Sequence, residues 1–176
     1  GFCEIVFQKD DSVKVNKLKL PEKVKDQLLS NLHIFYSGVT RSSNTILAEQ
    51  KQNILKKNNE LETLKSYTSK AKEFLLKKNF DAIGDLLNKS WLIKKTLATK
   101  ISNNTLDIMY QKALEAGALG GKILGAGGGG FLLIYCNISN SENLKKSFND
   151  YPEMFFNFEN DGSKIIFNNG GTDGNK

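Results

Sequence analysis

Alternating apolar and polar residues open the chain. Residues 2–8 and 12–18 both follow the two-residue period of a β-strand. Between them, residues 10–12 are Asp-Asp-Ser, and the side chains of Asp and Ser favour turns. The pattern therefore predicts a β-hairpin at the start of the chain.

A short helix and a buried strand are predicted next. Pro21 suits the first turn of a helix that carries Val24 and Leu28 on one face. The apolar run 33–36 then predicts a strand with both faces covered. It ends in the hydroxyl-rich loop 37–42, whose side chains are suited to cap the helix that begins near residue 43.

A long helical section follows, from residue 43 to residue 117. Apolar side chains recur at helical spacing over 61–75 and again over 83–97, so each stretch predicts a helix with one core-facing stripe. A further helix is predicted from Asn103, with Gly117 as its left-handed stop.

The character of the sequence changes after this helical section. The predicted elements are a strand at 118–124, a glycine loop at 125–130, a strand at 131–136, a helix at 141–150, and a last hairpin of 155–158 with 164–167. This order predicts an α+β fold in which one largely antiparallel sheet is covered by helices. We expect a single domain over 1–168 and a flexible tail over 169–176.

Composition places the chain among globular proteins. Its 176 residues are 39% hydrophobic and 25% charged, which suits one domain with its own core. No run approaches the roughly 20 apolar residues of a membrane span, and no signal peptide opens the chain, so we expect a cytoplasmic protein without a membrane partner. Gly1 stands inside a strand-like pattern, which predicts a fragment of a longer protein. Cys3 and Cys136 lie in apolar runs and are expected to be buried thiols.

The net charge is +6, and the lysines come as scattered pairs such as Lys94-Lys95, which we interpret as solvated helix faces. Nucleic-acid binding is therefore a weak alternative, and no aromatic RNA-binding strand motif is present. The only arginine, Arg41, is a better two-pronged partner for phosphate or carboxylate than a lysine is. It is a candidate anion ligand, with an ordinary surface or capping residue as the alternative. His33 is expected to be packed in its strand.

The run 125–130 holds five glycines and one alanine. It matches G-x-G-x-x-G, but it leads into a strand rather than a helix, so a dinucleotide site is excluded. A phosphate loop is excluded too, because Ile123 follows Lys122 and residue 116 is alanine. Such a run suits close backbone approach or positive φ, and its N–H groups could bind an anion. A hairpin connection packed against another backbone segment is the alternative.

At this loop the sequence resembles a known family. Residues 120–131 resemble the third motif of the GHMP kinases, K-x-x-G-A-G-x-G-G, including the strand that follows it. Residues 35–42 with 46–50 are similar to D-glycero-D-manno-heptose 7-phosphate kinases, and residues 161–166 to the last hairpin of that group. The resemblance implies a ferredoxin-like carboxy-terminal domain with an enlarged helical section.

The resemblance also implies ATP and Mg²⁺ as cofactors, a sugar phosphate as substrate, and an amino-terminal domain as partner. That domain would hold most of the nucleotide through P-x-x-x-G-L-G-S-S, which is missing here, so no residue of this chain is assigned as catalytic or as a metal ligand. The resemblance places Lys122, Gly125, Ala126, Gly127, Gly128, Gly129 and Gly130 beside the nucleotide. It places Ser37, Gly38, Thr40, Arg41 and Ser42 on the sugar-phosphate side.

The implied reaction moves the γ-phosphoryl group of ATP to the anomeric hydroxyl of a heptose phosphate, and the isolated chain is expected to be inactive. Galactose-, fucose- and mevalonate-type acceptors stay open as alternatives. A rival from another class is a non-catalytic ligand-binding or regulatory module, because ferredoxin-like domains also serve that purpose.

Overall fold

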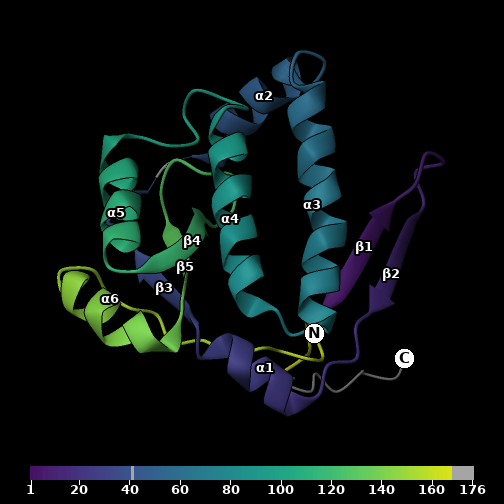
Figure 1. The fold of residues 1–176 in the computed structure, drawn as a ribbon. Helices are drawn as coiled ribbons and strands as arrows, with labels where there is room; N and C mark the ends of the chain where they lie inside the picture. The colour runs from purple at the N-terminus through teal and green to yellow at the C-terminus, as the bar shows by residue number, and fades with distance from the viewer. Residues whose placement is uncertain (41, 168–176) are drawn as a thin grey trace, which may run out of the picture. The chain divides into compact units, whose positions relative to one another are not determined.

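The computed structural model describes residues 1–40 and 42–167, so Arg41 and the predicted tail 169–176 lie outside the described residues. Its elements are shown in Figure 1. Residues 21–156 form one unit, and residues 1–20 with the described residues from Asn157 onward form another.

A three-stranded antiparallel sheet lies at the centre of unit 21–156. Its strands are β3 (Leu32–Tyr36), β4 (Ala118–Ile123) and β5 (Phe131–Cys136), in the order β3-β5-β4. Ile34 pairs with Leu133, and Ile123 pairs with Leu132. Leu132 and Ile134 of the central strand are fully buried. The predicted buried strands are therefore confirmed.

Helices make up most of the rest of this unit. They are α1 (Glu22–Leu29), α2 (Ser43–Asn53), α3 (Asn58–Leu76), α4 (Phe80–Lys95), α5 (Asn104–Glu115) and α6 (Ser141–Ser147), with a 3₁₀ turn, η1 (Ile138–Asn140), before α6. None of the helices in the described residues combines the length and apolar character that a membrane crossing requires. The helical section is confirmed, and α6 stops three residues before the predicted end.

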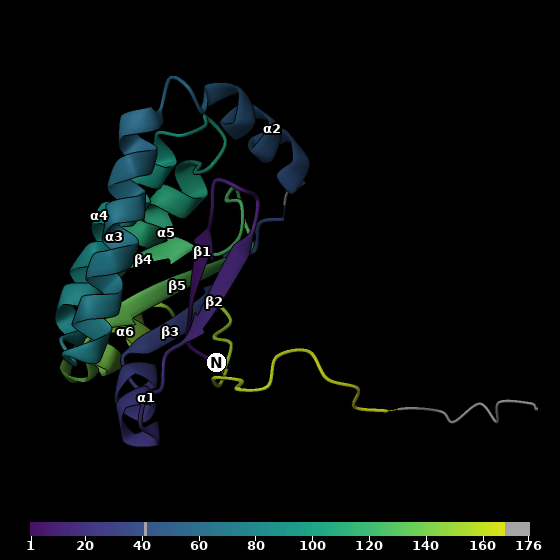
Figure 2. The ribbon, with the colours of Figure 1, turned by 90° about the vertical axis from the view of Figure 1, so that its right-hand side faces the viewer.

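The helix boundaries follow from local chemistry. Asn79 and Asn103 precede α4 and α5, and the side-chain oxygen of each accepts a hydrogen bond from the third amide along the chain. Gly117 follows α5 with φ +98°, as predicted for a left-handed stop. Figures 1 and 2 show α3 beside α4, while α4 and α5 lie over β4. An antiparallel sheet covered by helices is thus confirmed.

Two glycines allow α4 to approach β4 closely. A Cβ atom on Gly120 of β4 would lie 2.2 Å from the Gly84 carbonyl oxygen and 2.6 Å from the Asn88 nitrogen. A Cβ atom on Gly84 would lie 2.5 Å from the Tyr135 ring and 2.9 Å from the Leu119 Cβ atom. Neither position can carry a side chain without moving the helix away from the sheet.

The core of this unit is formed by side chains of α2, α4, α5, α6 and the sheet. Its largest fully buried side chains are Trp91, Tyr135, Phe35, Phe148, Ile46, Ile101, Leu106, Met109, Ile123, Leu132, Ile134 and Leu144. Cys136 is also buried, as predicted, and burial raises the pKa of its thiol.

The predicted first hairpin forms a sheet of its own. Among the described residues, strands β1 (Cys3–Phe7) and β2 (Val13–Lys17) pair only with each other, with Phe7 opposite Val13. The expectation of one sheet is therefore wrong. Cys3 is exposed, contrary to prediction. Its strand and the paired strand leave nearly all of their side chains uncovered, so the apolar run does not become part of a core.

The predicted last hairpin is also wrong. Residues 155–158 and 164–167 are not strands, although Gly162 between them has the positive φ of a turn, +72°. An apolar run becomes a strand only when a neighbouring strand completes its hydrogen bonds. Within the described residues, the one bridge near this segment pairs Phe35 with Glu153, and Ile166 is 91% exposed.

Replacement of Gly120 tests the close packing of α4. We expect Gly120→Ala to lower the free energy of unfolding by about 2–3 kcal/mol, because the new methyl group overlaps the backbone of α4. Urea denaturation followed by circular dichroism measures the change. Gly38→Ala is the control: Gly38, unlike Gly120, has positive φ, but nothing lies within 4 Å of its Cβ position, so only the backbone strain, a loss of about 1 kcal/mol, is expected. Equal losses would contradict the steric argument.

Candidate functional site

The glycine loop, residues 125–130, joins β4 to β5. The Leu124 amide donates to the Phe131 carbonyl oxygen at 2.8 Å and closes the ladder at its base. Four of the five loop glycines have positive φ, from +75° to +111°. L-residues with side chains rarely adopt this conformation, so the loop path itself requires glycine at these positions.

One side of the glycine loop packs against the end of β3. The Gly130 amide donates to the Val39 carbonyl oxygen at 2.7 Å. The Ser37 amide and hydroxyl both donate to the Gly130 carbonyl oxygen, at 2.9 and 2.7 Å. A Cβ atom on Gly129 would lie 2.4 Å from the Val39 carbonyl oxygen. This is the close backbone approach that the sequence predicted, and it joins the two groups of predicted site residues.

The other side of the loop packs against the segment between α4 and α5. The Gly128 amide donates to the Ile101 carbonyl oxygen at 2.8 Å, and the Asn103 side-chain amide donates to the Gly128 carbonyl oxygen at 3.2 Å. A Cβ atom on Gly127 would lie 2.7 Å from the Ile101 oxygen. Ile101 and Asn103 are contacts that the sequence analysis missed.

The loop amides divide into two groups. The amides of Gly128 and Gly130 donate to carbonyl oxygens of the protein itself. This part of the loop is therefore a hairpin connection packed against other backbone segments, the alternative to anion binding. No described residue accepts a hydrogen bond from the amides of Gly125, Ala126 or Gly127. Gly125 is exposed and the other two are partly exposed. These three amides are the part of the loop that an anion could meet.

Lys94, in the last turn of α4, lies against the start of the glycine loop. Its ammonium group donates to the Gly125 carbonyl oxygen at 2.6 Å. Burial, with a further contribution from the charge of Lys122, lowers the pKa of Lys94 to about 8. The interpretation of Lys94-Lys95 as a solvated pair is therefore wrong for Lys94, because the fold buries much of its side chain. Lys95 is different: it pairs with Asp107 at 3.0 Å.

Lys122 lies on β4 two residues after Gly120, so its side chain leaves the strand on the face that α4 covers. It is partly buried. In the part of the chain that the structure describes, no carboxylate forms an ion pair with Lys94 or Lys122. Positive charge thus gathers at the beginning of the glycine loop without an acidic neighbour.

The predicted substrate residues are only partly brought to the loop. Ser37 is buried and contacts Gly130, whereas Gly38, Thr40 and Ser42 are exposed. Ser42 precedes α2 as predicted, but its side chain makes no capping bond. Arg41 lies outside the described residues, so its role stays a prediction.

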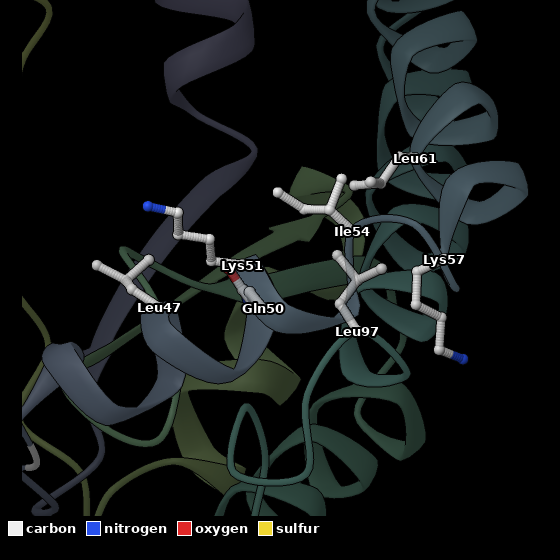
Figure 3. A pocket seen from close by; sticks show the side chains of 7 residues that line it. All are labelled: Leu47, Gln50, Lys51, Ile54, Lys57, Leu61 and Leu97. Carbon is white, nitrogen blue, oxygen red and sulfur yellow. The ribbon is translucent and has the colours of Figure 1, made fainter.

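A pocket of about 340 Å³ opens between α2 and α3. Figure 3 shows the side chains that line it: Leu47, Gln50, Lys51, Ile54, Lys57, Leu61 and Leu97. The lining is mostly apolar, and none of it comes from the glycine loop. Leu47 and Gln50 belong to the stretch 46–50 that resembles the heptose kinases, but the pocket lacks the amides found at the loop.

His33 on β3 is buried, as expected for a packed residue. Its Nδ1 atom lies 2.8 Å from a Glu153 carboxylate oxygen, and its Nε2 atom lies 3.2 Å from the Ser141 hydroxyl. The ring therefore links β3 to two segments that are distant from it in sequence, the start of α6 and the bridge at residue 153. This network satisfies the polar atoms of a buried side chain.

Comparison with known proteins supports the kinase resemblance. Residues 71–153 match the family model described as GHMP kinases C terminal. The D-glycero-alpha-D-manno-heptose 7-phosphate kinase of Campylobacter jejuni is 31% identical over 150 residues, 84% of this chain and 44% of that relative. The mevalonate kinase of Methanothermobacter thermautotrophicus is 36% identical over 76 residues, 43% of this chain and 24% of that relative.

A solved structure shares the fold. The D-glycero-D-manno-heptose 1-phosphate kinase of Bacteroides thetaiotaomicron superposes with a TM-score of 0.62 at 22% identity, over 88% of this chain and 41% of that chain. The present chain thus spans less than half the length of the relatives it matches.

Replacement of Gly129 tests the contact between the glycine loop and β3. We expect Gly129→Ala to push Val39 away and to weaken the bond between the Gly130 amide and the Val39 oxygen. Hydrogen exchange of the Gly130 amide should become about tenfold faster. Gly125→Ala strains the backbone through its positive φ, but its added methyl group meets nothing within 4 Å, so the exchange of the Gly130 amide should change much less. Unchanged exchange in Gly129→Ala would contradict the packing described.

The protonation of Lys94 provides a second test. We expect Lys94 to titrate near pH 8, and Lys122→Met to raise its pKa toward 10.5 without reaching it, because burial remains after the neighbouring charge is removed. Acetylation rates measured across pH by peptide mass spectrometry report this titration. Lys89→Met, on an exposed position of the same helix, is the control and should leave it unchanged. An ordinary lysine pKa in the wild type would contradict the prediction.

Proposed function

Because the chain carries the carboxy-terminal domain of the GHMP kinases, we propose that it is the carboxy-terminal half of an ATP-dependent sugar kinase. The proposed reaction transfers a phosphoryl group to the anomeric hydroxyl of a heptose 7-phosphate. The single observation that carries this proposal is the match to the heptose kinase over 150 residues, which extends well beyond residues 71–153.

The extent of the matches favours a heptose phosphate over mevalonate as acceptor. The heptose kinase match covers 84% of the chain, whereas the mevalonate kinase match covers 43%. Galactose- and fucose-type acceptors are the remaining alternatives. A kinase assay with these sugars distinguishes them from the heptose phosphate.

The glycine loop suits a role in phosphoryl transfer. That reaction depends on positioning and charge neutralisation more than on covalent catalysis by the protein. The bonds to Val39 and Ile101 hold the loop in place, so the amides of residues 125–127 are already oriented before a ligand binds. Lys122 adds positive charge beside them. ATP would supply the phosphoryl group, and this half would hold the phosphates.

The remaining parts of the proposed site come from elsewhere. Within the described residues there is no group of three His, Cys, Asp or Glu side chains placed to hold a metal ion. We therefore assign Mg²⁺ to the phosphates of ATP and to groups outside these residues. Arg41 is proposed to bind the anionic end of the sugar phosphate. The acid or base near the acceptor hydroxyl is proposed to lie in the amino-terminal half.

A kinase assay tests the proposal directly. The full-length protein encoded by the gene, incubated with ATP, Mg²⁺ and D-glycero-D-manno-heptose 7-phosphate, should form a product with a new anomeric phosphate in the ³¹P NMR spectrum. Residues 1–176 alone should form none, because the P-x-x-x-G-L-G-S-S nucleotide motif does not occur in them. Galactose, fucose and mevalonate are the comparison substrates.

Two results would overturn this function. Phosphorylation of mevalonate or of a free sugar in preference to the heptose phosphate would replace the substrate. Binding of a sugar phosphate by the full-length protein without any phosphoryl transfer would favour the non-catalytic module instead.

A further inference from the structure

We propose that Lys94 is a direct phosphate ligand, acting with Lys122 at the first residues of the glycine loop. The inference rests on the proposed function. It adds to the candidate site a residue of α4, a helix for which the sequence predicts only a core-facing stripe and a solvated lysine pair. The ligand class is a phosphate group, carried either by a nucleotide or by a sugar phosphate.

The first argument is the position of the ammonium group. Lys94 donates to the Gly125 carbonyl oxygen at 2.6 Å, which anchors the group at the start of the loop. A lysine ammonium has three donors, so two remain for a ligand. The space above Gly125 is open, because a Cβ atom there would have no neighbour within 4 Å.

The second argument is the unbalanced charge. Lys122 is close enough to disfavour the charge of Lys94, and both side chains are partly buried. Two other partly buried lysines have acidic partners, Lys57 with Glu60 and Lys95 with Asp107, both at 3.0 Å, and Lys112 lies over the Phe148 and Tyr151 rings. A phosphate group between Lys94 and Lys122 would replace their repulsion with two attractions.

The third argument is the set of neighbouring donors. The Gly125 amide precedes the carbonyl group that holds Lys94, the Ala126 and Gly127 amides follow it, and no described residue accepts a hydrogen bond from these three. Backbone amides together with an ammonium group form the donor set that proteins use for phosphate. One phosphate group at this place would therefore meet both kinds of donor.

Binding of inorganic tripolyphosphate and of a hexose 6-phosphate to residues 1–176, measured by calorimetry at about 0.15 M salt, tests the proposal. We expect Lys94→Met to raise Kd about tenfold for whichever probe binds. Lys89→Met, which removes the same charge from an exposed position on α4, should leave Kd within about twofold. Lys94→Arg should restore most of the affinity, which a loss of packing alone would not allow.

The two probes separate the two sources of phosphate. Tighter binding of tripolyphosphate would support the inference and identify the nucleotide as the source of the phosphate. Tighter binding of the hexose phosphate would support it and identify the sugar phosphate as the source. Amide shifts of residues 125–127 in NMR spectra should accompany either. Binding of neither probe, or equal losses in Lys94→Met and Lys89→Met, would overturn the inference.

The assay of the full-length protein distinguishes this inference from the proposed function. Full heptose kinase activity in Lys94→Met, with unchanged KM for both substrates, would overturn the inference alone. Tripolyphosphate binding through Lys94 in a protein that transfers no phosphoryl group would overturn the proposed function alone.

Discussion

Backbone-to-backbone contact at the glycine loop is the interaction on which the proposed site depends. Gly130 bonds to Val39, and Gly128 bonds to Ile101, so the loop is held from two sides by segments that are far away in sequence. The Val39 carbonyl oxygen lies 2.4 Å from the Cβ position of Gly129, and the Ile101 carbonyl oxygen lies 2.7 Å from that of Gly127, which is too close for a side chain. The absence of side chains therefore allows the contacts that immobilise the loop, and the loop presents its remaining amides in one arrangement.

The same constraint places α4. Gly84 and Gly120 let this helix lie directly on β4, and the helix then runs alongside the strand toward the loop. Its last turn brings Lys94 to the Gly125 carbonyl oxygen. Close packing between a helix and a strand thus sets the position of a charged side chain, and that charge is available to a ligand because no described carboxylate neutralises it.

Local pattern was sufficient for most of the elements. The hairpin around residues 10–12, the buried strand at 131–136 and the stop at Gly117 depend on side-chain alternation, continuous apolarity and positive φ, which are properties of neighbouring residues. The last hairpin failed for a different reason. Residues 155–158 and 164–167 have the apolar character of strands, but a strand also needs a partner, and the local pattern does not specify one.

By itself, the sequence determined the glycine loop, its place between two strands and the family that it resembles, because these depend on residues within a dozen positions of one another. Only the tertiary structure decided which segments the loop touches, that Ser37 joins it, and that Lys94 lies beside it while Lys95 pairs with Asp107. The physical reason is that helix rotation and strand pairing, rather than sequence spacing, bring residues 37, 94 and 125 together.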